Sequence, residues 1–216
     1  MRIRNVPGAF EKIMAHSHVV SKPMEHKGRW KEVFGNGNPI HLELGMGKGR
    51  FILGHAQAHP DVNYIGFEKF SSVLYRATEK IDHPGHHPNV RLLLEDVANL
   101  TDIFEENEVE RIYLNFSDPW PKDRHVRRRL THRDFLEKYS RVLGPCCDLV
   151  FKTDNQKLFD FSVEEMKAYG LEIVEYTRDL HNIPYAEGNI MTEYEKKFSG
   201  KGHPIYRVAV RFRPQP

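Results

Sequence analysis

The sequence predicts an α/β protein whose mostly parallel β-sheet carries helices on both faces. Three observations lead to this fold class. Short apolar runs typical of strands alternate with amphipathic segments typical of helices along most of the chain. A glycine-rich turn follows the first apolar run, where a strand would pass into a helix. Near the end of the chain, a long polar segment without a clear helix separates two apolar runs, which favours an antiparallel last strand.

The apolar runs define the expected strands, which cover residues 40–44, 64–67, 90–94, 111–116, 148–151, 172–177 and 205–212. Helical periodicity lies between them, at residues 50–58, 72–81, 99–106, 133–142 and 156–169. Gly170 suits the end of the last helix, and Thr131 with Asp134 resembles a capping box at the start of the helix before it. Strands that alternate with helices in this way form parallel sheets.

The composition is that of an ordinary globular chain. Of its 216 residues, 29% are charged and 39% are hydrophobic, and this length suits one α/β domain with appendages. No apolar run reaches the roughly 18 residues of a membrane span, and the amino terminus lacks the apolar core of a signal peptide. We therefore expect a cytoplasmic protein that does not associate with a membrane.

Basic residues are concentrated in two segments, although the net charge of the chain is only +2. Over residues 1–38 we expect a basic, flexible amino-terminal arm, followed by one folded domain over residues 39–216. The arm either binds RNA or is a solvated leader that packs loosely on the domain. The second basic segment, residues 122–141, follows the fourth expected strand.

The glycine-rich turn reads Glu43-Leu-Gly-Met-Gly-Lys-Gly49. A dinucleotide site would require the spacing G-x-G-x-x-G, but Arg50 occupies the place of its third glycine. The acid before the first glycine fits S-adenosylmethionine (SAM) better, since SAM has no pyrophosphate to cradle and carries a cationic methionine end. A tight turn that binds no ligand is the alternative. With the two terminal strands, the pattern is typical of a class I SAM-dependent methyltransferase with a Rossmann-like, seven-stranded sheet.

An acid also follows each of the first four strands: Glu43, Glu68, Asp96 and Asp118. Glu68 lies about 20 residues past the glycines, where nucleotide sites place a carboxylate on ribose hydroxyls. Asp96 would reach the adenine amine, and Glu43 would stabilise the turn and the methionine ammonium. Each acid alone could instead cap the next helix, but four acids in register with a glycine turn favour a cofactor site.

Asp118 opens the segment Asp118-Pro-Trp-Pro-Lys122, and a basic cluster follows at once. Ligands of open α/β sheets bind beyond the carboxyl ends of strands, which places Asp118 at a reaction site. We expect phosphate contacts from the basic side chains, and the alternative is a solvated charged face. Trp120 either stacks on a base or packs under the turn. The expected RNA-binding residues are Arg124, His125, Arg127, Arg128 and Arg129.

Cysteine and metal chemistry are disfavoured. Cys146 and Cys147 are adjacent and would bridge only with strain, so no disulfide is expected. Pro145-Cys146 resembles the nucleophilic pair of cytosine-C5 methyltransferases, but it does not follow the strand that carries Asp118. His55 and His59 are four residues apart, yet no glutamate follows His55, so no metal site is expected.

Most of the chain resembles the bacterial tRNA (guanine-N7-)-methyltransferase family of the TrmB type. The motifs that carry this resemblance are Glu43-Leu-Gly-Met-Gly-Lys-Gly49, Gly66-Phe-Glu68, Asn115-Phe-Ser-Asp118-Pro-Trp-Pro-Lys122, the basic run to Arg129, Phe151-Lys-Thr-Asp154-Asn155 and Thr192-Glu-Tyr-Glu195-Lys-Lys-Phe198. The resemblance implies methyl transfer from SAM to N7 of a guanosine in the tRNA variable loop, nucleotide 46. It also implies roles for individual residues. Asp118 matches the catalytic position; the cofactor-binding positions are Glu43, Gly45, Gly47, Gly49, Glu68, Asp96 and Asp118; and the substrate-binding positions are Lys122, Asp154, Thr192, Glu193, Tyr194 and Glu195.

The implied chemistry needs no strong general base, because N7 of guanine carries a lone pair and no proton. We expect direct in-line transfer that depends on positioning, without a covalent enzyme intermediate. Asp118 or Asp154 would accept hydrogen bonds from the guanine edge and favour the positive charge that develops on the ring.

Two other functions remain open at this point. Asp118-Pro-Trp resembles the motif of enzymes that methylate base amines. A non-catalytic RNA-binding module with an unused cofactor pocket is the second, while a dehydrogenase is disfavoured by Arg50 and the terminal strands. We expect tRNA as the substrate, no obligate protein partner, and a monomer or homodimer.

Overall fold

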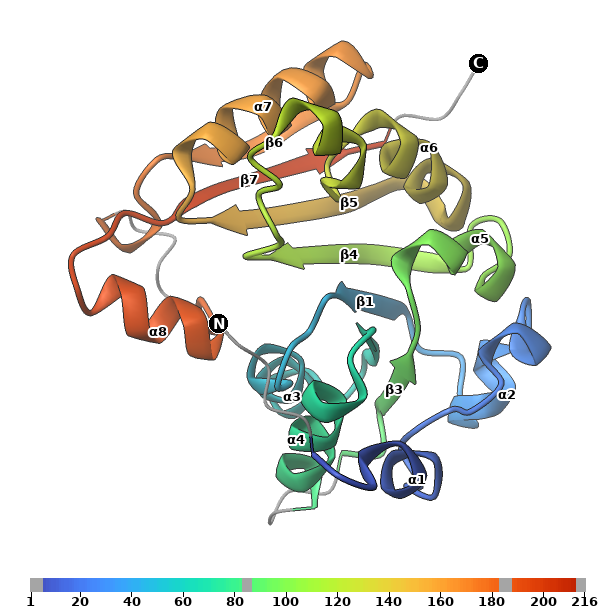
Figure 1. The fold of residues 1–216 in the computed structure, drawn as a ribbon. Coiled ribbons are helices and arrows are strands. Elements are labelled where there is room, and N and C mark those ends of the chain that lie inside the picture. The colour runs from blue at the N-terminus through green and yellow to red at the C-terminus, as the bar shows by residue number, and fades with distance from the viewer. Residues whose placement is uncertain (1–5, 83–86, 183–187, 213–216) are drawn as a thin grey trace. The chain divides into compact units, whose positions relative to one another are not determined.

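The computed structural model describes residues 6–82, 87–182 and 188–212. The chain consists of two compact units, Met1–Glu105 and Glu106–Pro216. Figure 1 shows the helices and strands of both units.

The first unit is built on parallel strands in the order β3-β2-β1. Its strands are β1 (Ile40–Leu44), β2 (Asn63–Glu68) and β3 (Val90–Leu94), and the helices between them are α3 (Arg50–Ala58) and α4 (Ser71–Ile81). Leu44 pairs with Phe67, and Glu68 pairs with Leu94. The carboxyl ends of these neighbouring strands are therefore at the same edge of the sheet.

The amino-terminal residues contribute to the core of this unit. They form α1 (Ala9–Met14), η1 (Pro23–His26) and α2 (Trp30–Phe34), and the unit ends with η2 (Val97–Asn99) and α5 (Leu100–Ile103). Trp30 is fully buried, and its indole Nε1 donates a 3.0 Å hydrogen bond to the carbonyl oxygen of Ile103. Ile13 is also fully buried, and Val19 forms a parallel bridge with Leu92. The domain boundary at residue 38 stays a prediction.

The second unit carries a mixed sheet in the order β4-β5-β7-β6. Its strands are β4 (Val109–Asn115), β5 (Leu143–Thr153), β6 (Glu172–Thr177) and β7 (Tyr206–Arg211). β4 and β5 are parallel, whereas β7 is antiparallel to both β5 and β6. The helical elements of this unit are η3 (Asp123–Arg128), α6 (Arg133–Val142), α7 (Gln156–Ala168), η4 (Leu180–Asn182) and α8 (Glu193–Ser199).

Side chains alternate between the two faces of β5, as the pleat of a strand requires. Phe151 is fully buried, and its ring lies 6.4 Å from that of Phe159 on α7. Lys152 follows on the opposite face and is also buried. In Figure 1, α8 lies beyond the ends of β4 and β5, where hydrogen bonds from α8 reach β5 and the residue after it.

Three details differ from the expectations. β5 begins at Leu143, five residues earlier than expected, and includes a register shift against β4 and a left-handed Cys146 (φ 64°). α5 covers Leu100–Ile103, so the expected helix over residues 99–106 forms but ends three residues early. α8 forms in the segment that showed no clear helical pattern.

Candidate active site

The glycine turn of the first unit has the backbone geometry that its sequence requires. Gly45, Gly47 and Gly49 have φ values of 79°, 60° and 79°, in the left-handed region that other residues rarely adopt. The amides of Gly45 and Met46 both donate to the carbonyl oxygen of Phe67, at 3.0 and 2.9 Å. The turn is thus fixed to the end of β2.

The acids of this unit lie at the carboxyl ends of β1, β2 and β3, as predicted. Glu43 is the next-to-last residue of β1 and is almost fully buried. Glu68 is the last residue of β2. Asp96 lies two residues after the end of β3 and is exposed. Burial raises the pKa of Glu68, although backbone amides of Phe70 and Gly47 counteract part of this effect. Asp96 accepts a 2.9 Å hydrogen bond from the amide of Ala98 and so caps η2.

These residues fit the nucleoside and methionine parts of SAM. No heavy atom lies within 4 Å of the position where a Cβ of Gly45 or Gly47 would be, so a ligand can approach the backbone there. Glu68 supplies carboxylate oxygens that can accept hydrogen bonds from ribose hydroxyls, as in nucleotide sites at the end of a second strand. A Cβ at Gly49 would meet the Cβ of Ala77 at 3.2 Å, which makes Gly49 important for packing α3 against α4.

Asp118 lies in a strained loop after β4 in the second unit. Phe116 (φ 54°) and Trp120 (φ 39°) both have left-handed backbones, which cost about 1–3 kcal/mol each for residues with side chains. The amide of Phe116 donates a 2.8 Å hydrogen bond to the carbonyl oxygen of Lys152 on β5. Between these two positions Asp118 is exposed, as a group that contacts a substrate must be. Strained residues around an exposed acid indicate a functional loop.

The basic cluster after this loop has two kinds of member. Lys122, Arg124 and Arg127 are exposed to solvent, in or directly before η3. Arg129 instead turns back to the loop, because its Nε and a terminal nitrogen donate to the carbonyl oxygens of Pro119 and Trp120 at 3.1 and 3.2 Å.

Trp120 itself is half-buried and contacts the same cluster. The guanidinium of Arg128 lies 4.9 Å from the Trp120 ring centroid, and the His125 ring meets it edge-on at 5.6 Å. A cation–π contact of this kind contributes about 0.5–1 kcal/mol at an exposed site. Trp120 is therefore in direct contact with two members of the cluster, His125 and Arg128.

Asp154 and Tyr194 come together although forty residues separate them. Asp154 follows β5, and Tyr194 lies in the first turn of α8. The Tyr194 hydroxyl donates a 3.0 Å hydrogen bond to Oδ2 of Asp154; the Tyr194 side chain is exposed and Asp154 is half-buried. Desolvation and the hydrogen bond to Asp154 raise the pKa of Tyr194 to about 12. Asn155, and not Asp154, caps α7, since its Oδ1 accepts from the amide of Leu158 at 2.9 Å.

The remaining predicted substrate residues form the beginning of α8. Thr192 caps the helix, with its hydroxyl accepting a 2.9 Å hydrogen bond from the amide of Glu195. Glu193 is half-buried, whereas Glu195 is fully buried. The pattern Thr192-x-x-Glu195 is that of a capping box, and this signal could have located α8 from the sequence.

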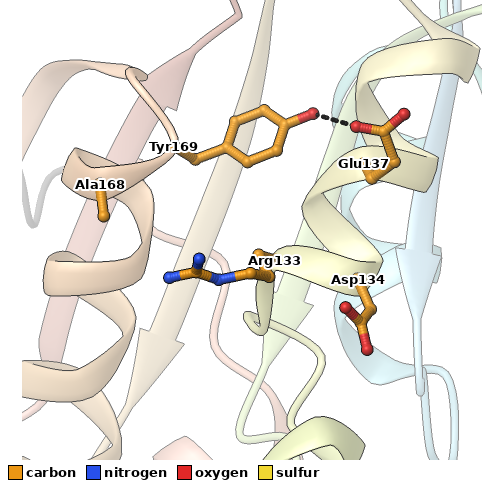
Figure 2. Close-up of a pocket in the computed structure, with 5 residues that line it drawn as sticks. All are labelled: Arg133, Asp134, Glu137, Ala168 and Tyr169. Carbon is orange, nitrogen blue, oxygen red and sulfur yellow. Dashed lines mark hydrogen bonds between the residues drawn. The ribbon is translucent and has the colours of Figure 1, made fainter.

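A pocket of about 550 Å³ lies between α6 and α7, and one of its lining residues, Asp134, lies 4.0 Å from Arg127 of the basic cluster. Figure 2 shows its lining: Arg133, Asp134, Glu137, Ala168 and Tyr169. The Tyr169 hydroxyl donates to Glu137 at 2.8 Å across this pocket. None of the lining residues is a predicted site residue, so the pocket does not identify the reaction site.

Within residues 6–82, 87–182 and 188–212, no group of three or more His, Cys, Asp or Glu side chains is placed to hold a metal ion. In the same ranges no helix is long and apolar enough to cross a membrane.

The fold and the site residues define the class of protein first. Two solved structures that the chain resembles are the 16S rRNA methyltransferase KamB, with a TM-score of 0.65 at 11% identity over 87% of this chain and 94% of that one, and an antibiotic-related methyltransferase, with 0.63 at 18% identity over 86% and 93%. A 16S rRNA adenine methyltransferase solved with its cosubstrate SAM gives 0.57 at 14% identity over 88% and 93%. This likeness confirms the predicted class I SAM-dependent methyltransferase fold, including the antiparallel last strand.

The family follows from the sequence comparisons. The model of a family described as putative methyltransferase matches residues 37–208. A tRNA (guanine-N(7)-)-methyltransferase of Lachnoclostridium phytofermentans is 54% identical over 99% of both chains, and one of Bacillus cytotoxicus is 50% identical over 100% of this chain and 99% of its own. The chain belongs to this methyltransferase family. The predicted membership, enzyme class and SAM cofactor are confirmed.

Proposed function

We propose that the protein transfers the methyl group of SAM to N7 of guanosine 46 in the tRNA variable loop, forming 7-methylguanosine. The observation that carries this proposal is the identity of 50% or more to tRNA (guanine-N(7)-)-methyltransferases over nearly the full length of both chains. The predicted site residues of each unit support the proposal. The first unit has acids around a glycine turn, and in the second unit the exposed Asp118 is followed along the chain by the basic cluster.

The first unit is proposed to bind the cofactor. Bound SAM supplies an electrophilic methyl group on a sulfonium. Glu68 accepts hydrogen bonds from the ribose hydroxyls, Asp96 accepts from the adenine amine, and Glu43 stabilises the turn and the methionine ammonium. The left-handed glycines keep the turn free of side chains where the ligand passes.

The second unit is proposed to hold the guanine. Asp118 or Asp154 accepts hydrogen bonds from N1–H and the exocyclic amine of the base, which are neighbouring donors that suit a carboxylate. The same negative charge favours the positive charge that develops on the ring as N7 is methylated. No proton leaves N7, so positioning of the lone pair in line with the methyl–sulfur bond is the main catalytic requirement.

The basic surface is proposed to bind the tRNA backbone. Lys122, Arg124 and Arg127 are exposed, and cationic side chains of this kind contact phosphates with an affinity that falls steeply with salt. Trp120, with Arg128 over its ring, offers a face for a base to stack on, worth about 1–3 kcal/mol. We also propose that the enzyme acts in the cytoplasm, where its tRNA substrate is found. It acts there without an obligate protein partner, as a monomer or homodimer.

The proposal is tested with two unmodified tRNA transcripts that carry guanosine or adenosine at nucleotide 46. Each transcript is incubated with the protein and methyl-labelled SAM, and the digested nucleosides are separated. We expect label in 7-methylguanosine from the guanosine transcript alone. Equal labelling of both transcripts, or label in an amine-methylated base, would refute the proposed site.

A further inference from the structure

We propose that Lys152 is a positioning residue, whose buried ion pair with Glu195 holds the beginning of α8 so that Tyr194 reaches Asp154. The inference rests on the proposed function, in which Asp118 or Asp154 holds the guanine, and on the substrate-binding position that the family resemblance implies for Tyr194. It assigns Glu195 to the support of that site and not to contact with the substrate.

The ion pair is fully enclosed. Lys152 Nζ lies 2.8 Å from Glu195 Oε2, and the two side chains are 2% and 0% exposed. Burying two charges is costly unless each is paired and its remaining hydrogen-bonding capacity is met. A buried pair of this kind often contributes little net stability, but it can enforce one arrangement of the elements that it joins.

Asn189 completes the hydrogen bonds of both charges. Its Oδ1 accepts from Lys152 Nζ at 3.1 Å, and its Nδ2 donates to Glu195 Oε1 at 2.7 Å. The carbonyl oxygen of Ile190 accepts the third bond of the ammonium at 3.4 Å. An ammonium has three donors, and the segment leading into α8 and α8 itself supply three acceptors for Lys152.

His181 faces the same carboxylate from η4. Its Nε2 lies 3.3 Å from Glu195 Oε1 but lacks the alignment of a hydrogen bond. The polar groups that surround Glu195 thus come from β5, from η4 and from the segment before α8. This arrangement fixes the rotation of α8 about its own axis, because turning the helix would leave Glu195 and Lys152 unpaired.

That rotation decides where Tyr194 lies. Glu195 points into the protein, and its neighbour Tyr194 is 42% exposed and donates to Asp154. The Tyr194 ring lies 5.0 Å from that of Phe116 and stacks at 4.2 Å on that of Phe198. Tyr194 therefore contacts both acid-bearing segments: the loop that leads to Asp118, and Asp154.

The backbone of Lys152 joins the same two segments. Its carbonyl oxygen accepts from the amide of Phe116, two residues before Asp118, and Asp154 lies two residues after Lys152. One residue thus links the Asp118 loop, Asp154 and α8. A methionine at this position would keep the strand pairing and remove the link to α8.

The test uses the full chain with Lys152→Met and Glu195→Met combined, so that no unpaired charge is left inside the protein. We expect this double variant to fold and to bind SAM with a dissociation constant within about twofold of wild type, as measured by calorimetry. Its kcat/KM for the tRNA transcript should fall on the order of ten- to a hundredfold, because Tyr194 is misplaced by a shift of α8.

A double-mutant cycle separates positioning from a general structural effect. Tyr194→Phe should lower kcat/KM in the wild-type background and have no further effect in the double variant. The matched control is Arg211→Met, which removes an ion pair with Asp148 (3.0 Å), four residues before Lys152 on β5. In that control the effect of Tyr194→Phe should stay at its full size. An undiminished effect in the double variant, or an equal loss of it in the control, would overturn the inference.

Hydrogen exchange tests the inference independently of activity. Amides of residues 189–199 should exchange faster in the double variant than in wild type, including that of Glu195, which donates to Thr192. Unchanged exchange would refute the role of Lys152. If wild type itself forms no 7-methylguanosine, the proposed function fails, while the exchange result still decides whether the ion pair orders α8.

Discussion

The hydroxyl of Tyr194 donates a 3.0 Å hydrogen bond to Oδ2 of Asp154 and so joins the first turn of α8 to the residue that follows β5. Desolvation, together with the nearby carboxylate, raises the pKa of Tyr194 to about 12. The phenol is therefore protonated at neutral pH and remains a donor, and Asp154 remains the acceptor.

Tyr194→Phe removes this hydrogen bond and keeps the ring between Phe116 and Phe198. A hydrogen bond to a charged group contributes about 1.5–3 kcal/mol. We expect kcat/KM for tRNA to fall about tenfold or more, and the free energy of unfolding to fall by less than about 1.5 kcal/mol, because the Tyr194 side chain is 42% exposed and water can replace the lost donor. Steady-state kinetics and urea unfolding would measure both, and unaltered kinetics would remove the pair from the site.

Asp118→Asn should retain the fold and lose turnover. The carboxylate is exposed after β4, so its loss leaves no buried group without a partner. Loss of a group that stabilises developing charge costs about a hundredfold or more in kcat. Asp123→Asn, an exposed acid five residues further on, is the matched control and should retain wild-type turnover. Comparable turnover in the two variants would exclude Asp118 from the reaction.

Glu68 gives the cofactor site a pH dependence of known sign. Burial raises its pKa above the ordinary value. Cofactor affinity should therefore fall as the pH is lowered through this raised pKa, because a protonated carboxyl accepts ribose hydrogen bonds less well. The free energy of unfolding changes in the opposite direction. It decreases as the pH rises from the pKa of Glu68 in the unfolded chain to its higher pKa in the folded protein, because the unfolded state ionises first.

Glu68→Gln should remove both effects. We expect SAM affinity to be about ten- to a hundredfold weaker at neutral pH and to lose this component of its pH dependence. As the pH increases, the free energy of unfolding of wild type should decrease more than that of the variant, which lacks the titrating carboxyl. Calorimetric titration of SAM at several pH values measures the first point. A variant whose affinity follows the wild-type pH curve would show that Glu68 is not the titrating group.

Substitutions of Arg124 and Arg129 should differ in their effect on the salt dependence of tRNA binding. Arg124→Ala removes an exposed cation, so the slope of log affinity for tRNA against log salt should decrease by about one. Arg129→Lys keeps the charge but loses the fork that donates to Pro119 and Trp120, so turnover should fall while the salt slope stays constant. Filter binding over a range of salt concentrations separates the two, and a reduced slope for Arg129→Lys would identify it as a phosphate contact.

Much of the fold was predictable because periodicity and glycine placement are local signals. The strand ends at Glu43 and Glu68 follow from apolar runs that stop at an acid, and the glycine turn requires left-handed backbones that the structure shows. These features place Glu43 and Glu68, the predicted cofactor residues at the ends of β1 and β2, at one edge of the sheet of the first unit.

Features that depend on distant partners were not predictable. Thr131 was expected to cap α6, but its hydroxyl is buried against that of Ser162 at 2.7 Å, and His132 caps the helix instead. The capping pattern at Thr192 could have indicated where α8 begins, but the burial of Glu195 depends on Lys152, forty-three residues away. In the sequence, Arg129 is indistinguishable from the other arginines of the basic cluster. Only its hydrogen bonds to the carbonyl oxygens of Pro119 and Trp120 show that it holds the loop.

The most direct test of the central claim is chemical cleavage of the product tRNA. The cationic ring of 7-methylguanosine is reduced by borohydride, after which aniline breaks the chain at that nucleotide. After incubation of an unmodified transcript with the protein and SAM, we predict a single enzyme-dependent break at nucleotide 46. Methyl incorporation without a break would contradict methylation at N7, and a break elsewhere would contradict the assigned guanosine.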